Sequence, residues 1–205
     1  MFLIFVLSLN GVLVAQDWTQ SHDWVELTEQ DGFILDLRYA TKQNFVDHVI
    51  YDCGRCFLRK DVAEQLIAAK NAFAERGVRI KLFDCYRPLE VQWELWEEVP
   101  DPRYVADPRK GSMHNRGMAV DLTLVNAQTA KELDMGTGFD FFGRKAYHTT
   151  TPELSRQIQI NRKLLKSTLE KFGFQAIRTE WWHYSYTGPN GNWPIHEAKW
   201  NCPTE

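Results

Sequence analysis

The chain has 205 residues, of which 44% are hydrophobic and 25% charged, and its net charge is −3. These values are typical of one globular domain with a hydrophobic core, and they exclude a collagen-like, disordered or long coiled-coil protein. The slightly acidic balance also argues against a nucleic-acid binder, which normally carries a basic face. We therefore expect a single globular domain that does not bind nucleic acid.

Residues 1–15, MFLIFVLSLNGVLVA, carry no charged side chain, and Asp17 is the first acidic residue. An apolar run that ends in small residues predicts a secretory signal peptide. The run is too short for a membrane-spanning helix, which needs about 20 apolar residues. A buried N-terminal strand or helix is the alternative. We expect residues 16–205 to form the domain, exported to the periplasm without stable membrane association once the signal is removed.

The cysteines are Cys53, Cys56, Cys85 and Cys202. An even number of cysteines in an exported chain predicts structural disulfides, and four cysteines allow three complete pairings. The spacing of Cys53 and Cys56 would also suit half of a zinc ribbon, but the sequence has no second pair with that spacing. We expect disulfides and leave their pairing open.

The first predicted helix covers residues 62–76. Asp61 and Glu64 have the spacing of a capping box at its start, and Gly77 is a usual stop after its end. Apolar and charged residues then alternate over residues 78–82, which predicts a half-buried strand.

A second helix is predicted after this strand, with Leu89, Trp93 and Trp96 on one face at helical spacing. Residues 99–110 contain prolines and charges and are expected to form a loop. Residues 117–125, GMAVDLTLV, are almost continuously apolar, which predicts a largely buried strand.

The third predicted helix begins with Thr151 as N-cap and Pro152 at the first helical position, and it stops at Gly173. Its expected buried face consists of Leu154, Ile158, Leu165, Leu169 and Phe172. A last strand-like segment covers residues 174–186. Because helices and strands interleave, we predict an α+β fold in a single domain.

Residues 112–121, SMHNRGMAVD, contain His114 and Asp121 on either side of a glycine. Neutral imidazole and carboxylate are both good Zn²⁺ ligands. Asp121 lies inside the apolar strand, and a buried carboxylate without a partner costs several kcal/mol, so it needs a cation or good hydrogen-bond donors. Taken alone, His114 has a simpler alternative as a hydrogen-bonded residue at the start of a strand.

In a second motif, Glu180 and His183 flank two tryptophans. A catalytic zinc site uses three protein ligands and leaves one position for water, and His114, Asp121 and His183 supply that number. Glu180 would then be the base that takes a proton from the water. Residues 180 and 183 point to opposite faces of a regular strand, so a bend or bulge must bring Glu180 to the metal. The alternative is a surface Glu180 beside two core tryptophans.

Five motifs occur in one order along the chain: residues 38–45, 84–88, 112–121, 135–142 and 180–183. Together they resemble the zinc D-alanyl-D-alanine dipeptidases, which include the vancomycin-resistance dipeptidase. That family is related to the zinc D,D-carboxypeptidases and to the hedgehog fold. The resemblance implies a hedgehog/D,D-peptidase-like α+β domain with a mixed or antiparallel sheet, flanking helices and one Zn²⁺ per chain.

The resemblance also implies roles for single residues. His114, Asp121 and His183 would bind zinc. Glu180 would be the general base and later the acid that protonates the leaving amine. Arg87 would stabilise the oxyanion of the tetrahedral intermediate, as a preorganised donor can. Without the resemblance, the alternative for Arg87 is a surface residue at the start of a helix.

Three further residues, Tyr39, Ser112 and Asp140, resemble positions near the termini of the substrate. Asp84 is expected to be a buried partner that orients Arg87 or a backbone turn. His148 matches the family only loosely and is expected at the surface or the rim of the site.

We predict a zinc dipeptidase that hydrolyses the small dipeptide D-Ala-D-Ala to two D-Ala in cell-wall peptide turnover. The nearest alternative is a zinc D,D-carboxypeptidase that trims the terminal D-Ala of peptidoglycan stem peptides. A remote alternative is a non-catalytic zinc-binding module, which predicts a missing base or oxyanion donor, whereas Glu180 and Arg87 are both present. The sequence leaves the oligomeric state open.

Overall fold

The structure is a computed structural model that describes residues 17–149, 153–189 and 192–203. The predicted signal peptide, residues 1–15, lies outside the described residues, as does the predicted start of the third helix at Thr151 and Pro152.

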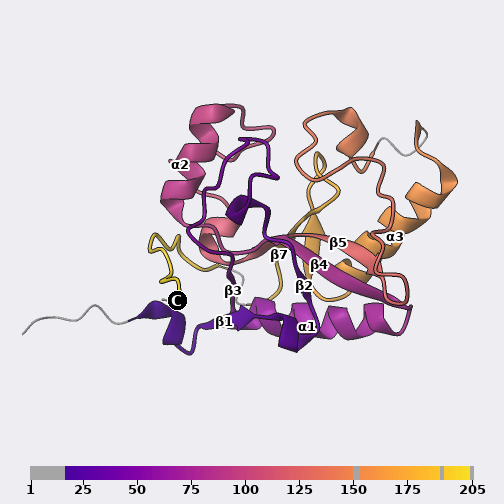
Figure 1. The fold of residues 1–205 in the computed structure, drawn as a ribbon, viewed down its shortest axis with the longest axis horizontal. Helices are drawn as coiled ribbons and strands as arrows, with labels where there is room; N and C mark the ends of the chain where they lie inside the picture. The colour runs from indigo at the N-terminus through magenta and orange to yellow at the C-terminus, as the bar shows by residue number, and fades with distance from the viewer. Residues whose placement is uncertain (1–16, 150–152, 190–191, 204–205) are drawn as a thin grey trace, which may run out of the picture.

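A five-stranded sheet, in the order β2-β4-β5-β7-β6, forms the centre of the fold (Figure 1). Its strands are β2 (Ile34–Leu35), β4 (Val78–Asp84), β5 (Ala119–Asn126), β6 (Phe174–Ala176) and β7 (His183–Tyr186). β2 is parallel to β4, and the other neighbours are antiparallel. A second sheet pairs β1 (Trp24–Leu27) with β3 (Cys56–Arg59) in antiparallel orientation. The predicted α+β class with a mixed sheet is confirmed.

Three α-helices surround the central sheet: α1 (Lys60–Ala74), α2 (Leu89–Glu98) and α3 (Arg156–Glu170). In Figure 1, α1 runs below the sheet and α3 lies at its right-hand side, while α2 lies on the upper left. Short 3-10 helices are η1 (Trp18–Gln20), η2 (Glu29–Asp31), η3 (Arg38–Ala40), η4 (His114–Arg116) and η5 (Arg144–Ala146). Among the described residues, no helix has the length and apolar character needed to cross a membrane.

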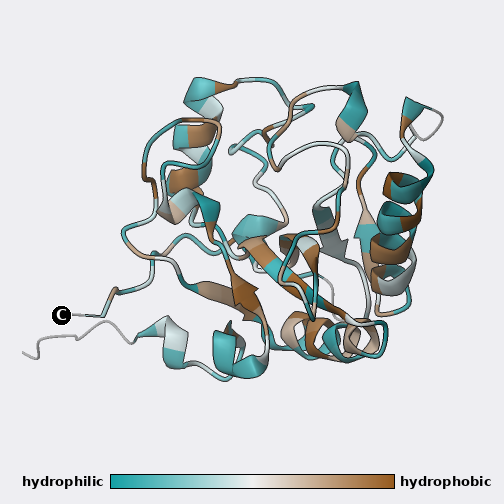
Figure 2. Ribbon diagram, turned by 45° about the vertical axis from the view of Figure 1, so that its right-hand side comes forward, coloured by the Kyte–Doolittle hydropathy of each residue, from teal (hydrophilic) through white to brown (hydrophobic). Residues whose placement is uncertain are grey.

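The hydrophobic core lies between the central sheet and the helices α1 and α3. Strand β5 is buried along nearly its whole length, as its apolar sequence predicts. Figure 2 shows hydrophobic residues concentrated on the central strands and on parts of the helices, with hydrophilic residues on the outer turns. A second, aromatic-rich cluster lies under α2 and includes Tyr39, Tyr51, Tyr86 and Trp200.

The predicted capping box at the start of α1 is wrong. Strand β3 ends at Arg59 and α1 begins at Lys60, so that Arg59 is the N-cap and makes no side-chain cap hydrogen bond. Asp61 therefore lies inside the first turn, where a carboxylate still interacts favourably with the helix dipole. The strand continues directly into the helix, which leaves no loop in which a capping residue could stand.

The predicted buried face of α2 is also wrong. The buried residues are Val91, Gln92 and Leu95, whereas Trp93 is 41% exposed. Val91 and Leu95 pack into the aromatic cluster, and the amide of Gln92 hydrogen-bonds to the Arg87 side chain and to a loop carbonyl. The helix is thus rotated so that a polar side chain reaches an internal partner.

The third helix begins at Arg156, with Ser155 as its N-cap. Of the predicted face, Leu165 and Leu169 are buried in the helix, Leu154 is buried just before it, and Ile158 and Phe172 are partly buried. The predicted final strand is wrong in its extent. It is two strands, β6 and β7, which pair with each other with Phe174 opposite Tyr186. Residues 177–182 connect them outside the ladder, and this connection contains Glu180.

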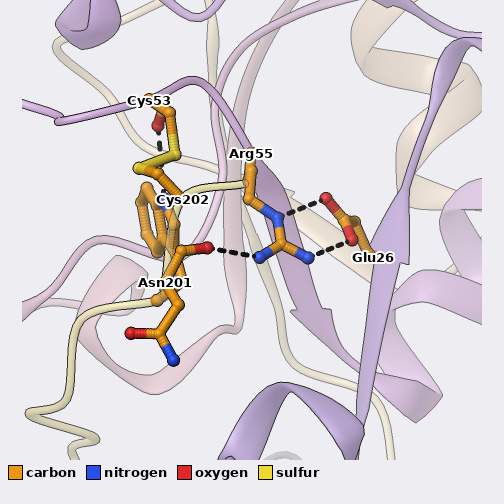
Figure 3. The surroundings of a disulfide bond; sticks show 6 residues. Glu26, Cys53, Arg55, Asn201 and Cys202 are labelled. Atoms are coloured by element: carbon orange, nitrogen blue, oxygen red, sulfur yellow. Dashed lines mark hydrogen bonds and ion pairs between the residues drawn. A yellow bond between two sulfur atoms is a disulfide. The ribbon is translucent and has the colours of Figure 1, made fainter. Parts of the chain in front are cut away.

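All four cysteines form disulfides, as predicted, with Cys53 bonded to Cys202 and Cys56 to Cys85. Figure 3 shows the first of these pairs, which holds the C-terminal segment against the rest of the domain. Beside it the guanidinium of Arg55 donates two hydrogen bonds to the carboxylate of Glu26, at 2.7 and 2.6 Å, and one to the carbonyl of Asn201 (Figure 3). The C-terminal segment is therefore fixed by covalent and polar contacts.

Candidate metal centre

The three predicted metal ligands lie together at one end of the central sheet. Strands β5 and β7 pair so that Asp121 is directly opposite His183, and His114 comes from η4, just before β5. The distance from His114 Nε2 to His183 Nδ1 is 3.1 Å, and Asp121 Oδ1 lies 3.3 and 3.0 Å from these two nitrogens. Two potential ligand atoms from the adjoining elements η4 and β5 and one from the distant strand β7 therefore converge on one point.

These residues fit a zinc ion. Ligands at about 2.0–2.2 Å from one tetrahedral ion lie about 3.3–3.6 Å from each other, close to the separations observed here. Burial acts to raise the pKa of Asp121, but the charges and hydrogen bonds of His114 and His183 outweigh it and hold that pKa well below its usual range. Burial lowers the pKa of His183. An ionised carboxylate and a neutral imidazole are the forms that bind Zn²⁺.

Each histidine has a further hydrogen bond on its other ring nitrogen. His114 Nδ1 donates to the carbonyl oxygen of Cys85 at 2.6 Å, which leaves Nε2 free for the metal. His183 Nε2 lies 3.0 Å from the hydroxyl of Ser185. Ser185 follows His183 on the same face of β7, so strand periodicity could have identified it, whereas the Cys85 carbonyl carries no sequence signal.

Glu180 lines the same cavity as the three ligands. It is 9% exposed and stands in the irregular connection before β7, which satisfies the predicted need for a bend. Burial raises its pKa well above the usual value, the negative charges of Asp121 and Asp140 add to this, and Arg87 opposes it. A raised pKa makes a carboxylate a stronger base, and a metal cation nearby would restrain the rise.

Arg87 is buried and also lines the cavity, so the alternative of a surface residue is wrong. Its Nε and Nη2 both donate to Asp84 Oδ2, at 2.9 and 2.7 Å, which confirms Asp84 as its buried partner. Nη1 donates to Gln92 at 3.0 Å, and the hydroxyl of Tyr51 donates to the other oxygen of Asp84 at 2.7 Å. Neither Gln92 nor Tyr51 has a spacing that would have identified it from sequence.

The three predicted substrate-contacting residues are placed differently from one another. Asp140 and Ser112 line the cavity, whereas Tyr39 is buried and is not among the lining residues. The hydroxyl of Tyr39 donates to Asp140 Oδ2 at 3.1 Å, and the Arg87 guanidinium lies 5.0 Å from the centre of its ring. Tyr39 therefore supports two cavity residues from behind.

The cavity has a volume of about 460 Å³, within the range of roughly 300–1,000 Å³ that small-molecule sites occupy. Trp182 lines it, while Trp181 packs edge-on against Trp182 and donates to Thr137. Arg103 and Tyr104, from the predicted loop, complete one side.

His148 is not part of this cavity. It was expected at the surface or rim, but it is half-buried against the ring of Tyr184, and its Nε2 has no hydrogen-bond partner among the described residues.

The sequence profile of the Peptidase M15 family, described as D-ala-D-ala dipeptidase, matches residues 21–199. Over 170 residues the chain is 35% identical to a D-alanyl-D-alanine dipeptidase of Escherichia coli K12, covering 82% of this chain and 86% of that protein. It is 34% identical over 176 residues to a D-alanyl-D-alanine dipeptidase of Enterococcus faecium, covering 75% and 85%. A solved vancomycin-resistance D,D-pentapeptidase variant in complex with Zn(II) shares 19% identity at a TM-score of 0.44, covering 65% and 74%.

Proposed function

This chain belongs to the Peptidase M15 family of D-Ala-D-Ala dipeptidases and is a zinc metallopeptidase, and we propose that it hydrolyses D-Ala-D-Ala to two D-alanines. The observation that supports this most directly is the convergence of His114, Asp121 and His183 in one cavity with Glu180 and Arg87. Ligands, base and oxyanion donor are thus available within a single site.

Zn²⁺ held by His114, Asp121 and His183 would supply Lewis-acid polarisation of the scissile carbonyl and of the attacking water. Glu180 takes the proton of that water and then delivers it to the leaving nitrogen. Arg87 uses its N–H groups that are not bonded to Asp84 or Gln92 to stabilise the charge that develops on the carbonyl oxygen.

The ends of a free dipeptide are an ammonium and a carboxylate. We propose that Asp140 binds the ammonium, because it is a carboxylate on the cavity wall, with one oxygen held by Tyr39. Burial and the charge of Asp121 raise the pKa of Asp140, and a bound ammonium would favour its ionised form. Ser112, whose hydroxyl accepts a hydrogen bond from the Asn115 backbone, is the proposed polar contact on the opposite terminus.

The decisive experiment compares hydrolysis of D-Ala-D-Ala with that of a stem pentapeptide ending in D-Ala-D-Ala by the purified zinc-loaded protein. The proposal predicts release of D-Ala from the dipeptide, with a much higher kcat/KM than for the pentapeptide. A preference for the pentapeptide would instead identify a carboxypeptidase.

We further propose that the protein acts after export to an oxidising compartment, the periplasm, in the turnover of cell-wall peptides. Its two disulfides support this, since such bonds are rare in reducing compartments. Fractionation of cells that express the full chain tests the location: activity confined to the cytoplasmic fraction would contradict it.

A further inference from the structure

Residues 84–88 connect the end of β4 to α2 and carry several groups of the site. The β4–β5 register shifts between Leu82 and Asp84, and Asp84 opposite Asp121 is the last pair of the ladder. Residues 85–88 lie beyond the end of β4 and do not pair with a neighbouring strand. They must nevertheless place Arg87 and the Cys85 carbonyl against the metal ligands. Something other than sheet pairing must therefore hold this segment.

The backbone N–H of Arg87 donates to the carbonyl of His114 at 3.2 Å, and the Asn115 side chain donates to the Arg87 carbonyl at 2.8 Å. Strand β3, which belongs to the other sheet, supplies the support on the opposite side. Its first residue, Cys56, forms the disulfide with Cys85, and the backbone N–H of Tyr86 donates to the carbonyl of Phe57 at 2.9 Å. Cys56 and Cys85 are 0% and 1% exposed. The disulfide is thus a buried covalent link between the second sheet and the residue whose carbonyl accepts from His114.

We propose that the Cys56–Cys85 disulfide is a positioning element of the metal centre. By fixing the Cys85 carbonyl at the Nδ1–H of His114, it selects the tautomer of His114 that presents Nε2 to the ion. Outer hydrogen-bond partners of this kind contribute about 10- to 100-fold to metal affinity. The inference rests on the zinc site of the proposed function, and it extends that site to two residues that do not contact metal or substrate.

The bond forms when two thiols pass two electrons and two protons to an external disulfide, which becomes two thiols as the Cys56–Cys85 bond is made. Because both sulfurs are buried in the folded domain, this exchange takes place during folding. Chain that folds with the thiols reduced is expected to bind zinc more weakly, so disulfide formation after export would complete the metal site.

The test compares two double variants, Cys56→Ala/Cys85→Ala and Cys53→Ala/Cys202→Ala, in a zinc competition assay with a chelator. The second pair is the matched control. Its cysteines are 149 residues apart, against 29 for the first pair, so its removal increases the conformational entropy of the unfolded chain by more. We expect zinc affinity to fall about 10- to 100-fold for the first variant only. Unchanged affinity in the first variant, or an equal loss in both, would overturn the proposal.

A second measurement follows the tautomer itself. In the ¹⁵N-histidine spectrum of the zinc-free wild-type protein, His114 should carry its proton on Nδ1, and in Cys56→Ala/Cys85→Ala it should exchange between the two nitrogens. A single Nδ1–H form in both proteins would contradict the inference. The variant Cys56→Val/Cys85→Ala, which refills the volume of the lost sulfur, serves if the first does not fold. Zinc affinity and the His114 tautomer are both measured without dipeptide turnover. They can therefore be interpreted even if the protein does not hydrolyse D-Ala-D-Ala.

Discussion

The guanidinium of Arg87 donates two hydrogen bonds to one oxygen of Asp84, while its Nη2 lies 3.7 Å from Asp121 Oδ2. The charge of the proposed oxyanion donor, Arg87, therefore interacts directly with that of the proposed metal ligand Asp121. Burial lowers the pKa of Arg87, but Asp84, with Tyr39, Tyr51 and Asp121, more than compensates and raises it above the usual value. Arg87 thus remains a cation although its side chain is buried.

Replacing Arg87 with Lys should lower kcat about 100- to 1,000-fold, because loss of one preorganised donor at a developing oxyanion has this effect. Lysine keeps the charge, but it cannot donate to Asp84 and Gln92 at the same time from a planar guanidinium. The measurement is steady-state hydrolysis of D-Ala-D-Ala, with zinc content determined on the same sample. Arg109→Lys, at an exposed position paired with Asp107 outside the cavity lining, is the control and should change kcat little. Equal kcat values for Arg87→Lys and the wild type would contradict the assigned role.

Gly117 should not tolerate a side chain. It adopts a φ of +69° at the end of η4, and an added Cβ would lie 2.3 Å from the ring of Trp24. The left-handed conformation alone costs about 1–2 kcal/mol for a non-glycine residue. We expect Gly117→Ala to lower the free energy of unfolding by at least about 2 kcal/mol in urea titrations, and to weaken zinc binding because Gly117 follows the His114 turn.

Gly138 provides the matched control for this substitution. A Cβ added there meets no atom within 4 Å. Gly138→Ala should therefore leave the free energy of unfolding close to that of the wild type. If the two alanine variants were equally stable, the packing of η4 against Trp24 would not be as described.

His148 should make the fold sensitive to mild acid. Burial, aided by the charges of Lys166 and Arg162, lowers its pKa to about 4, compared with about 6.5 in the unfolded chain. The unfolded state therefore binds the proton more readily. The contribution of His148 is fully present above pH 6.5 and is lost as the pH falls from about 6.5 towards 4. Because the side chain is partly exposed, we expect about 2 kcal/mol rather than the full value of the shift.

The measurement is the free energy of unfolding from urea titrations at several pH values for wild type and His148→Phe, which keeps a ring against Tyr184. The variant should lose less stability than the wild type between pH 6.5 and 4. His22→Phe, at an exposed position, is the control and should follow the wild type. Parallel curves for wild type and His148→Phe would exclude this residue as the cause.

The sequence indicated candidate metal ligands because Asp121 is a charged residue inside an apolar strand and His114 stands just before it. It predicted the need for a bend at Glu180, since a regular strand would have turned that side chain away from His183. These inferences depend on local pattern, and the structure brings the residues together as β5 pairs with β7. The fold class followed in the same way from the alternation of helices and strands.

The features that the sequence did not predict are decided by tertiary contacts. The face of α2 is set by Gln92, whose partners are Arg87 and a distant carbonyl. Tyr39 was expected near a terminus of the substrate, and its burial behind Asp140, to which its hydroxyl donates, was not apparent from sequence. The disulfide pairing was open to three combinations, and only the folded arrangement of β3 beside residues 84–88 selects one.

The most direct test of the central claim is to measure zinc content and D-Ala-D-Ala turnover together for the wild type and Glu180→Gln. The wild type should contain one zinc per chain and release D-Ala. Glu180→Gln should keep the zinc, because His114, Asp121 and His183 are intact, while its kcat falls about 10²- to 10⁴-fold, the usual contribution of a general base. A Glu180→Gln protein that binds zinc and hydrolyses the dipeptide at the wild-type rate would contradict the account.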